Sequence, residues 1–203
     1  FGCRDKKGNF NPKSFEQKAK REQVKMIEIK LSQGAKPGHG GMLLAPKVTQ
    51  EIAKTRGIAM HQDCISPAKH SEFSNPEELL RFVDKLRKLS GGKPVGIKLC
   101  VGHPWEIISI IKTMTTTKKY VDFITVDGAE GGTGAAPAEF TDHIGCPLKD
   151  AIVFVDNALV GANLRDRVKI GASGKVVSAF DIAHMCALGA DWVNMARPFM
   201  FSI

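Results

Sequence analysis

Short apolar runs alternate with amphipathic stretches along most of this chain. Apolar runs that are too short for helices predict strands over residues 26–31, 95–99, 121–126, 168–172 and 192–196. Between these runs, apolar residues recur at helical spacing, as Leu79, Val83 and Leu86 do. Strands that alternate with helices are typical of parallel βα units, so the pattern predicts an α/β protein.

Helix-start signals support this division of the chain. Asn75 followed by Pro76 and two acidic residues predicts the start of a helix. Ser178 with Asp181 three residues later has the spacing of a capping box. Both signals stand directly before a stretch with helical spacing, so each predicts a helix that follows a strand.

Residues 151–166 fit either a strand or a helix. Ile152 to Val155 is a β-prone run, whereas Leu148, Ile152, Val155 and Leu159 repeat at helical spacing. Because residues 164–167 resemble a helix exit, we interpret the stretch as a helix.

The predicted elements indicate an α/β fold, a (β/α)8 TIM-type barrel of which this chain contains about five carboxyl-terminal βα units. The frame apolar-x-Ile-Lys-Leu-x-x-Gly occurs at residues 27–34 and again at 95–102, as repeated βα units would give. An open sheet is the alternative, because five strands cannot close an eight-stranded barrel. We expect the barrel domain at residues 25–203 and a basic, poorly ordered leading segment at residues 1–24.

Composition narrows the classes of function. The chain has 203 residues, 43% of them hydrophobic, which is enough to bury one core. No apolar run approaches the ~20 residues of a membrane span, so no membrane partner is expected. The five scattered cysteines lack CxxC spacing, which predicts reduced thiols in the cytoplasm. The first residue is Phe1, which indicates a fragment or a processed chain.

Charge and potential ligands exclude further classes. The formal net charge is +8, but no nucleic-acid reader motif accompanies it, so no nucleic acid is expected as a partner. The six histidines show no paired metal spacing, and no metal site is predicted. Cys64 and Cys100 are more typical of packing residues than of nucleophiles. Positive charge favours small anionic substrates instead.

Two lysines are the first candidates for chemistry. Lys30 and Lys98 each lie near the carboxyl end of an apolar predicted strand, where parallel strands are covered on both faces. Either both side chains reach solvent, or both present positive charge to one site. Their equivalent positions favour the shared site. A flavin ring would suit it, because a nearby lysine stabilises the anionic reduced form.

Glycine-rich loops follow three of the predicted strands or lie beside them. Residues 127–137 contain four glycines, which permit sharp turns and close approach to a ligand. Gly171 to Gly174, Ala196 and Arg197 follow the last two strands, where barrels often bind phosphate through backbone N–H groups. Tight packing of the loops is the alternative interpretation.

Several of these motifs together resemble one known family. In chain order they are Ile29 to Gly41, Ile65 to Pro67, Lys98-Leu99, Gly131 to Ala135, and Leu164 to Arg167. From about residue 26 to residue 200, the chain resembles the FMN-binding synthase domain of glutamate synthase. It is most similar to the shorter, stand-alone members, because no glutaminase or electron-input domain is visible.

The resemblance implies an FMN-binding barrel and an oxidoreductase that makes L-glutamate for amino-acid biosynthesis. In such an enzyme, 2-oxoglutarate and ammonia give 2-iminoglutarate, which reduced FMN converts to glutamate by hydride transfer. By motif position, Lys30, Gln33 and Lys36 correspond to substrate-binding groups, and Lys30, Lys36 and Lys98 to catalytic ones. The implied FMN-binding residues are Lys98, Gly131, Gly132, Thr133, Ser173, Gly174, Ala196 and Arg197.

Departures from the family pattern leave alternatives open. Where the large enzymes have a Gln that contacts 2-oxoglutarate, this chain has Met42, and His39 replaces a Glu. Another FMN barrel oxidoreductase with a different small acid substrate, or a truncated barrel that serves as a binding module, therefore remains open. The family's iron–sulfur cysteines would fall beyond Ile203. The partners that the family pattern allows are a second copy of the chain and an electron donor, which is either an NADPH-linked protein or a ferredoxin.

Overall fold

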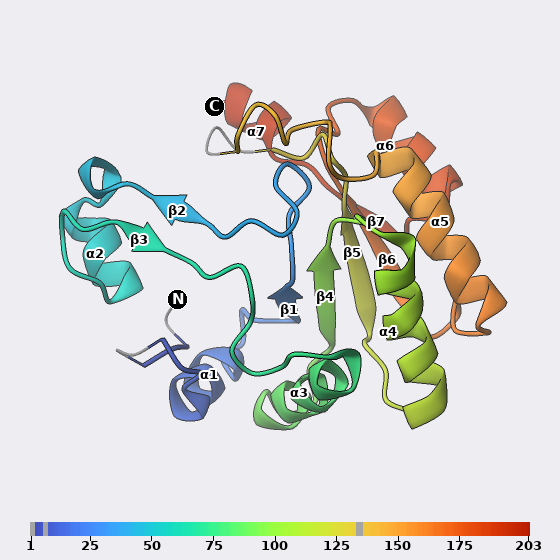
Figure 1. The fold of residues 1–203 in the computed structure, drawn as a ribbon, viewed down its shortest axis with the longest axis horizontal. Helices are drawn as coiled ribbons and strands as arrows, with labels where there is room; N and C mark the ends of the chain where they lie inside the picture. Colours follow the sequence, from blue (N-terminus) through green and yellow to red (C-terminus); the bar gives the residue numbers. More distant parts are fainter. Residues whose placement is uncertain (1–2, 6–7, 133–135) are drawn as a thin grey trace.

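Parallel strands form the central sheet of the molecule (Figure 1). The computed structural model describes residues 3–5, 8–132 and 136–203. In this part of the chain, five strands lie side by side in the order β1-β4-β5-β6-β7, and every neighbouring pair is parallel. All five predicted strands are confirmed: β1 (Ile27–Lys30), β4 (Val95–Leu99), β5 (Phe123–Asp127), β6 (Lys169–Ser173) and β7 (Trp192–Asn194).

Helices connect these strands. They are α1 (Pro12–Ala19), α2 (Gln50–Arg56), α3 (Pro76–Leu89), α4 (Pro104–Thr117), α5 (Leu148–Gly161), α6 (Ala179–Ala187) and α7 (Arg197–Phe201). Helices α3 and α6 begin where the sequence predicts. The Asn75 side chain accepts a hydrogen bond from the Glu78 N–H group at 2.9 Å and caps α3. Ser178 and Asp181 form the predicted capping box at the start of α6. These caps satisfy N–H groups that the helices cannot pair internally.

The ambiguous stretch around residue 152 is a helix, as interpreted from its spacing. It begins earlier than residue 151, at Leu148, and ends at Gly161 rather than at residue 166. Leu148, Ile152, Val155 and Leu159 are all buried and form the stripe that faces the core. Burial of this stripe outweighs the β propensity of the run, because propensity is the weaker effect.

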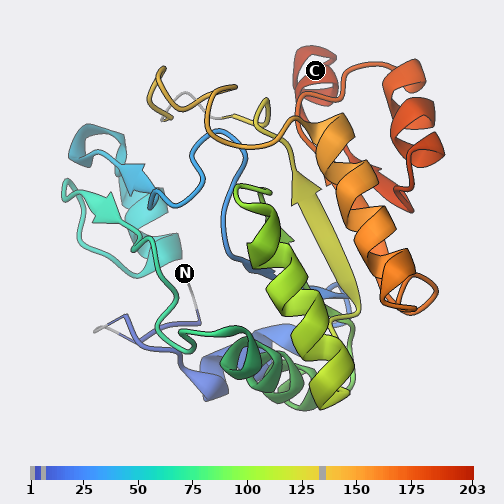
Figure 2. The ribbon, with the colours of Figure 1, turned by 45° about the vertical axis from the view of Figure 1, so that its right-hand side comes forward.

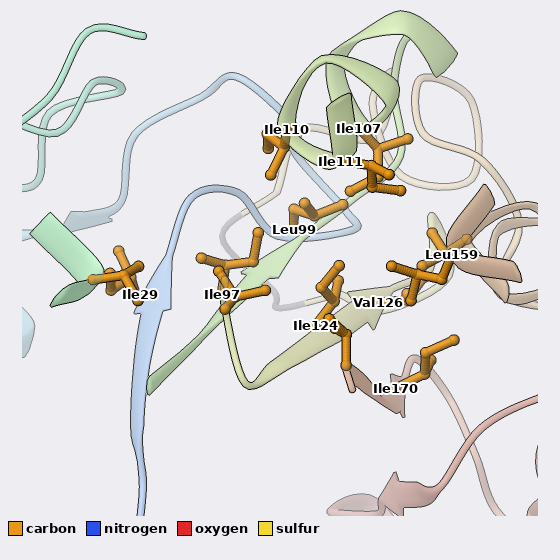
Figure 3. Packing of buried hydrophobic residues seen from close by; sticks show 14 of the residues in the cluster. Ile29, Ile97, Leu99, Ile107, Ile110, Ile111, Ile124, Val126, Leu159 and Ile170 are labelled. Carbon is orange, nitrogen blue, oxygen red and sulfur yellow. The ribbon is translucent and has the colours of Figure 1, made fainter. Parts of the chain in front are cut away.

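The hydrophobic core lies between the helices and one face of the sheet (Figure 3). Helices α4 and α5 cross this face side by side (Figure 2). Ile97, Ile124 and Ile170 from three neighbouring strands point towards Ile107 of α4 and Leu159 of α5. Since side chains alternate along a strand, the residues directly before and after each of these isoleucines face the other side of the sheet.

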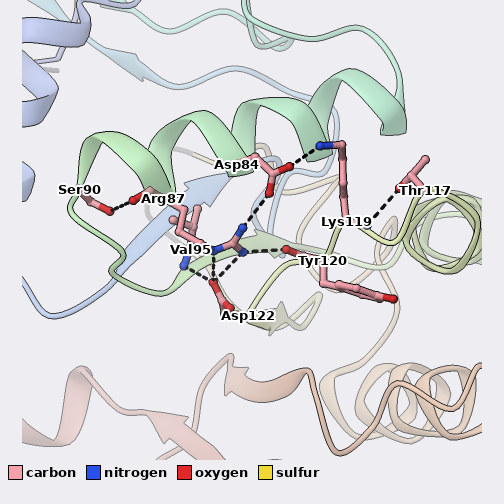
Figure 4. A network of polar contacts seen from close by, with 8 residues as sticks. All are labelled: Asp84, Arg87, Ser90, Val95, Thr117, Lys119, Tyr120 and Asp122. Atoms are coloured by element: carbon pink, nitrogen blue, oxygen red, sulfur yellow. Dashed lines mark hydrogen bonds and ion pairs between the residues drawn. The ribbon is translucent and has the colours of Figure 1, made fainter.

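A network of polar contacts holds the amino ends of β4 and β5 (Figure 4). Asp122 accepts a hydrogen bond from the Val95 N–H group at 2.7 Å and pairs with Arg87 at 2.9 Å. Arg87 also pairs with Asp84 at 2.8 Å, and Lys119 pairs with Asp84 at 2.6 Å. The network joins α3 to the start of both strands, so it fixes the end of the sheet opposite the loops described below.

Residues 42–65 form a small lobe beside the sheet (Figure 1). Strands β2 (Met42–Leu43) and β3 (Cys64–Ile65) pair antiparallel, and a 3-10 helix (Ala45–Lys47) precedes α2. The lobe has its own core of Val48, Ala53 and Cys64. The sequence predicts one short helix over residues 47–54 and irregular chain after Gly57; strands of two residues are too short to leave a periodic pattern.

The leading segment contains α1, although little order is expected there from the sequence. Phe15 and Ala19 of α1 are buried in the main core, and the Asn11 side chain caps the helix. The Phe10 ring lies 5.1 Å from the Phe82 ring of α3, edge to face. These apolar contacts attach a strongly charged segment to the sheet domain. Within the described residues, no helix has the length and apolarity needed to cross a membrane.

Candidate functional site

A cavity lies at the carboxyl ends of the parallel strands. Its volume is about 360 Å³, and every strand of the main sheet, or the loop that follows it, contributes to its wall. Ligand sites in α/β sheets form at this edge. The lining residues are Lys30, Gln33, Lys98, Asp127, Gly131, Gly132, Ser173, Gly174, Lys175, Val176, Asn194, Met195, Ala196 and Arg197. Nine of them are residues that the sequence analysis singled out.

The two candidate lysines stand side by side in this wall. Lys30 is the last residue of β1, and its register partner in β4 is Lys98. Ile29 and Ile97, one residue earlier, are buried on the helix side, so both lysines point to the opposite face. The Lys30 ammonium group donates a hydrogen bond to the Gln33 side-chain oxygen at 2.6 Å. The paired strands therefore present two cations to one cavity.

The electrostatics of the cavity reflect this pairing. Burial lowers the pKa of Lys30 below its ordinary value, and the positive charges of Lys98 and Lys36 lower it further. The negative charges of Asp127 and Glu28 oppose this effect but do not cancel it. Two neighbouring ammonium groups repel each other, so a bound anion would lower the energy of both.

Asp127 is a cavity residue that sequence reasoning missed. It ends β5, and its side chain is only 6% exposed. One carboxylate oxygen accepts a hydrogen bond from the Gly34 N–H group at 3.0 Å and lies 3.3 Å from the Lys98 ammonium nitrogen. A carboxylate at the carboxyl end of a buried strand, directly before a glycine-rich loop, is the signal that could have identified it.

Glycines allow the loop after β1 to lie directly on the loop after β5. A Cβ atom on Gly34 would fall 1.6 Å from the Gly128 carbonyl oxygen, so no other residue fits there. The Ala35 N–H group donates a hydrogen bond to the Gly131 carbonyl oxygen at 2.7 Å. The described first part of the glycine-rich loop, residues 127–132, is thus a tightly packed segment of the cavity wall rather than a free connection.

The opposite side of the cavity comes from the loops after β6 and β7. Gly174 has a φ of 141° and Lys175 a φ of 45°, both in the region that favours glycine. Lys175 lies 3.3 Å from Asp142 in the loop after β5. Ser173, Gly174, Ala196 and Arg197, the residues implied for phosphate binding, all line this side.

Other candidates lie elsewhere. Lys36 is buried and is not among the lining residues, although its charge acts on Lys30. Thr133 lies outside the described residues. His39 and Met42, the two departures from the family pattern, do not line the cavity either. Met42 is in β2, where it pairs with Ile65.

Neither a reactive Cys100 thiol nor a metal cluster is found among the described residues. Burial, and then the charge of Asp127, raises the pKa of Cys100 to about 11, so its thiol stays neutral near neutral pH. A neutral buried thiol is a poor nucleophile. Among the described residues, no cluster of three or more His, Cys, Asp or Glu side chains could hold a metal ion.

Comparison with known families agrees with this geometry. The family model described as the conserved region in glutamate synthase matches residues 16–203. The chain belongs to the glutamate synthase family. It is 45% identical to the glutamate synthase large subunit-like protein YerD of Bacillus subtilis, over 100% of this chain and 38% of that protein. It is 41% identical to the archaeal glutamate synthase [NADPH] of Methanocaldococcus jannaschii, over 87% of this chain and 34% of that protein.

Solved structures show the fold of this family member to be barrel-like. A flavocytochrome b2 variant with pyruvate bound superposes with a TM-score of 0.55 at 15% identity, over 95% of this chain and 41% of that one. DHODH of Eimeria tenella gives a TM-score of 0.52 at 11% identity, over 95% of this chain and 50% of that one. The prediction of an α/β barrel fold, present here in part, is confirmed. The chain spans about a third of the length of the curated relatives it matches.

Proposed function

We propose that this chain forms the carboxyl-terminal part of the barrel of an FMN-dependent oxidoreductase of glutamate synthase type. The observation that supports it best is the shared cavity at the carboxyl ends of the strands, with paired Lys30 and Lys98 on one side and the implied phosphate loops on the other. Family membership supports the same assignment. We include the activity in this proposal, because the chain covers only about a third of the length of its relatives.

The residues present suit FMN. The cavity volume of about 360 Å³ lies within the ~300–1,000 Å³ typical of small-molecule sites. Among the described lining residues, four are cationic and one is a carboxylate, which favours a ligand with a phosphate and an electron-rich ring. Gly131 and Gly132 present bare backbone to the cavity, so a flat ring can approach closely.

Each side of the cavity then has a role. Lys98 and Lys30 lie on the side where the ring would bind, and Ser173, Gly174 and Arg197 on the side where the phosphate would bind. Arginine side chains and backbone N–H groups are suitable hydrogen-bond donors to a phosphate group. Gln33, hydrogen-bonded to Lys30, would help to hold a substrate carboxylate beside the ring.

When bound, reduced FMN supplies the hydride that converts 2-iminoglutarate, formed from 2-oxoglutarate and ammonia, to L-glutamate. The chain's own residues bind and orient. With FMN bound, Lys98 would supply positive charge that favours the reduced ring, and Lys30 would attract the carboxylate of an oxo acid. The paired strands hold the backbones of both lysines in fixed positions. The two positive charges would therefore need little rearrangement during hydride transfer.

A flavin spectrum and a turnover assay test the proposal. The purified protein should show flavin absorbance, release FMN on denaturation, and form glutamate from 2-oxoglutarate and ammonia when a reductant is supplied. A colourless protein that cannot be loaded with FMN would contradict it and would favour the binding module. Bound FMN without glutamate formation would favour an oxidoreductase for another small acid, which a panel of oxo and hydroxy acids would identify.

A further inference from the structure

Asp127 lies where three segments of the cavity wall come together. It ends β5, contacts Lys98 of β4 through an ion pair of 3.3 Å, and accepts the Gly34 N–H group of the loop after β1 at 3.0 Å. A Cβ atom on Gly131 would lie 2.7 Å from its other carboxylate oxygen. The carboxylate is thus enclosed by groups from three separate segments.

Asp127 is also the only carboxylate among the described lining residues, which include the cations Lys30, Lys98, Lys175 and Arg197. Of these cations, Lys175 pairs with Asp142 outside the lining. The burial of Asp127 makes its charge effective, because few waters screen it. Removing one partner of such a pair leaves the other charge buried and uncompensated. The position of Lys98 and the balance of charge in the cavity therefore depend on the same carboxylate.

We propose that Asp127 is a positioning residue that holds Lys98 and the Gly34 loop against the cavity and favours the cationic form of Lys30. Its importance for the reaction rests on the proposed function, because the two ammonium groups matter there only if the cavity holds flavin. Its effect on the lysines themselves is independent of any bound group.

The charged groups that act on Lys30 come from four separate positions in the sheet and its loops. They are Lys98 of β4, Asp127 of β5, Lys36 of the loop after β1 and Glu28 of β1 itself. Lys98 lowers the pKa of Lys30 and Asp127 raises it. Substitutions at these two positions should therefore move the titration of Lys30 in opposite directions, which a general loss of structure would not do.

Competitive acetylation of the purified protein measures this titration directly. Trace acetic anhydride labels neutral amines, and mass spectrometry reports the labelling of Lys30 relative to exposed Lys54 at each pH. In Asp127→Asn the midpoint for Lys30 should move to lower pH, so that labelling at a fixed pH below the midpoint rises several-fold. In Lys98→Met the midpoint should move to higher pH. An unchanged midpoint in folded Asp127→Asn overturns the proposal.

The double variant covers the case in which Asp127→Asn fails to fold because Lys98 is left unpaired. Lys98→Met/Asp127→Asn removes both charges, and its Lys30 midpoint should lie below that of Lys98→Met alone. Equal midpoints in those two proteins would overturn the proposal. Asp122→Asn is the matched control, because this carboxylate also accepts a backbone N–H group but lies at the amino end of the sheet. It should leave the Lys30 midpoint unchanged.

Flavin reduction separates this inference from the proposed function. If FMN binds, the alkaline limb of the reduction rate should move to lower pH in Asp127→Asn, in parallel with the labelling midpoint. If FMN does not bind, the proposed function fails, and the labelling experiment still decides the role of Asp127. A reduction profile that keeps its alkaline limb in folded, FMN-loaded Asp127→Asn would contradict the link to the reaction.

Discussion

The two ends of the sheet place a carboxylate against a backbone N–H group in the same way, yet they differ in their surrounding charge. At the amino end, Asp122 accepts the Val95 N–H group and pairs with Arg87. At the carboxyl end, Asp127 accepts the Gly34 N–H group and pairs with Lys98. The contacts at the amino end join α3 to the strands, whereas those at the carboxyl end lie in the wall of a cavity.

In the described part of the chain, the two ends differ in how many charged side chains have no ion-pair partner. At the amino end, Arg87 and Lys119 are matched by Asp84 and Asp122. At the carboxyl end, Lys98 pairs with Asp127 and Lys175 with Asp142, which leaves two of the described lining cations, Lys30 and Arg197, outside any ion pair. Paired charges stabilise a fold only modestly, whereas surplus charge in a concave site attracts a ligand of opposite sign. Surplus charge, rather than charge itself, distinguishes the candidate site.

The largest effect is expected from Gly34→Ala. The new methyl group would overlap the Gly128 carbonyl oxygen, which belongs to the backbone and cannot move aside. We expect the free energy of unfolding to fall by about 3 kcal/mol and FMN binding to be lost. Urea unfolding and flavin absorbance measure the two effects. Gly161→Ala, whose Cβ would meet nothing within 4 Å, is the control and should not destabilise the protein.

Lys98→Met should have the next largest effect, mainly on reactivity, with some loss of stability because Asp127 is left buried without its ion-pair partner. The change removes a cation from the cavity but keeps most of the side-chain volume. We expect flavin reduction to slow by roughly 10- to 100-fold, because positive charge no longer stabilises the reduced ring. Stopped-flow absorbance measures this rate. An unchanged rate in an FMN-loaded variant would mean that Lys98 does not act on the ring.

Arg87→Met should have the smallest effect and should leave the cavity intact. It breaks the contacts with Asp84 and Asp122 at the amino end. We expect a loss of about 1–2 kcal/mol in the free energy of unfolding, measured in urea, with normal FMN affinity. Arg81→Met, which removes an exposed ion pair with Glu77, should leave the free energy of unfolding nearly unchanged, because solvent screens that pair. Weakened FMN binding in Arg87→Met would show that the two ends are coupled.

Local patterns predicted most of the fold but little of the small lobe. Asn75 and Ser178 cap the helices that their positions indicate, because a cap depends on residues only three apart. The pairing of Met42 with Ile65 could not be predicted, since strands of two residues have no periodicity. Helix α7 was missed as well; it has only five residues.

The sequence by itself determined the strands, the caps and the equivalent places of Lys30 and Lys98, because each follows from neighbours a few residues apart. Only the tertiary structure decided which groups meet. Asp127 and Gly34 are 93 residues apart, and their hydrogen bond exists because β1, β4 and β5 pair in one register. Register is set by packing of the whole sheet, so no local pattern reports it. That packing also buries Lys36 and leaves Lys30 facing the cavity.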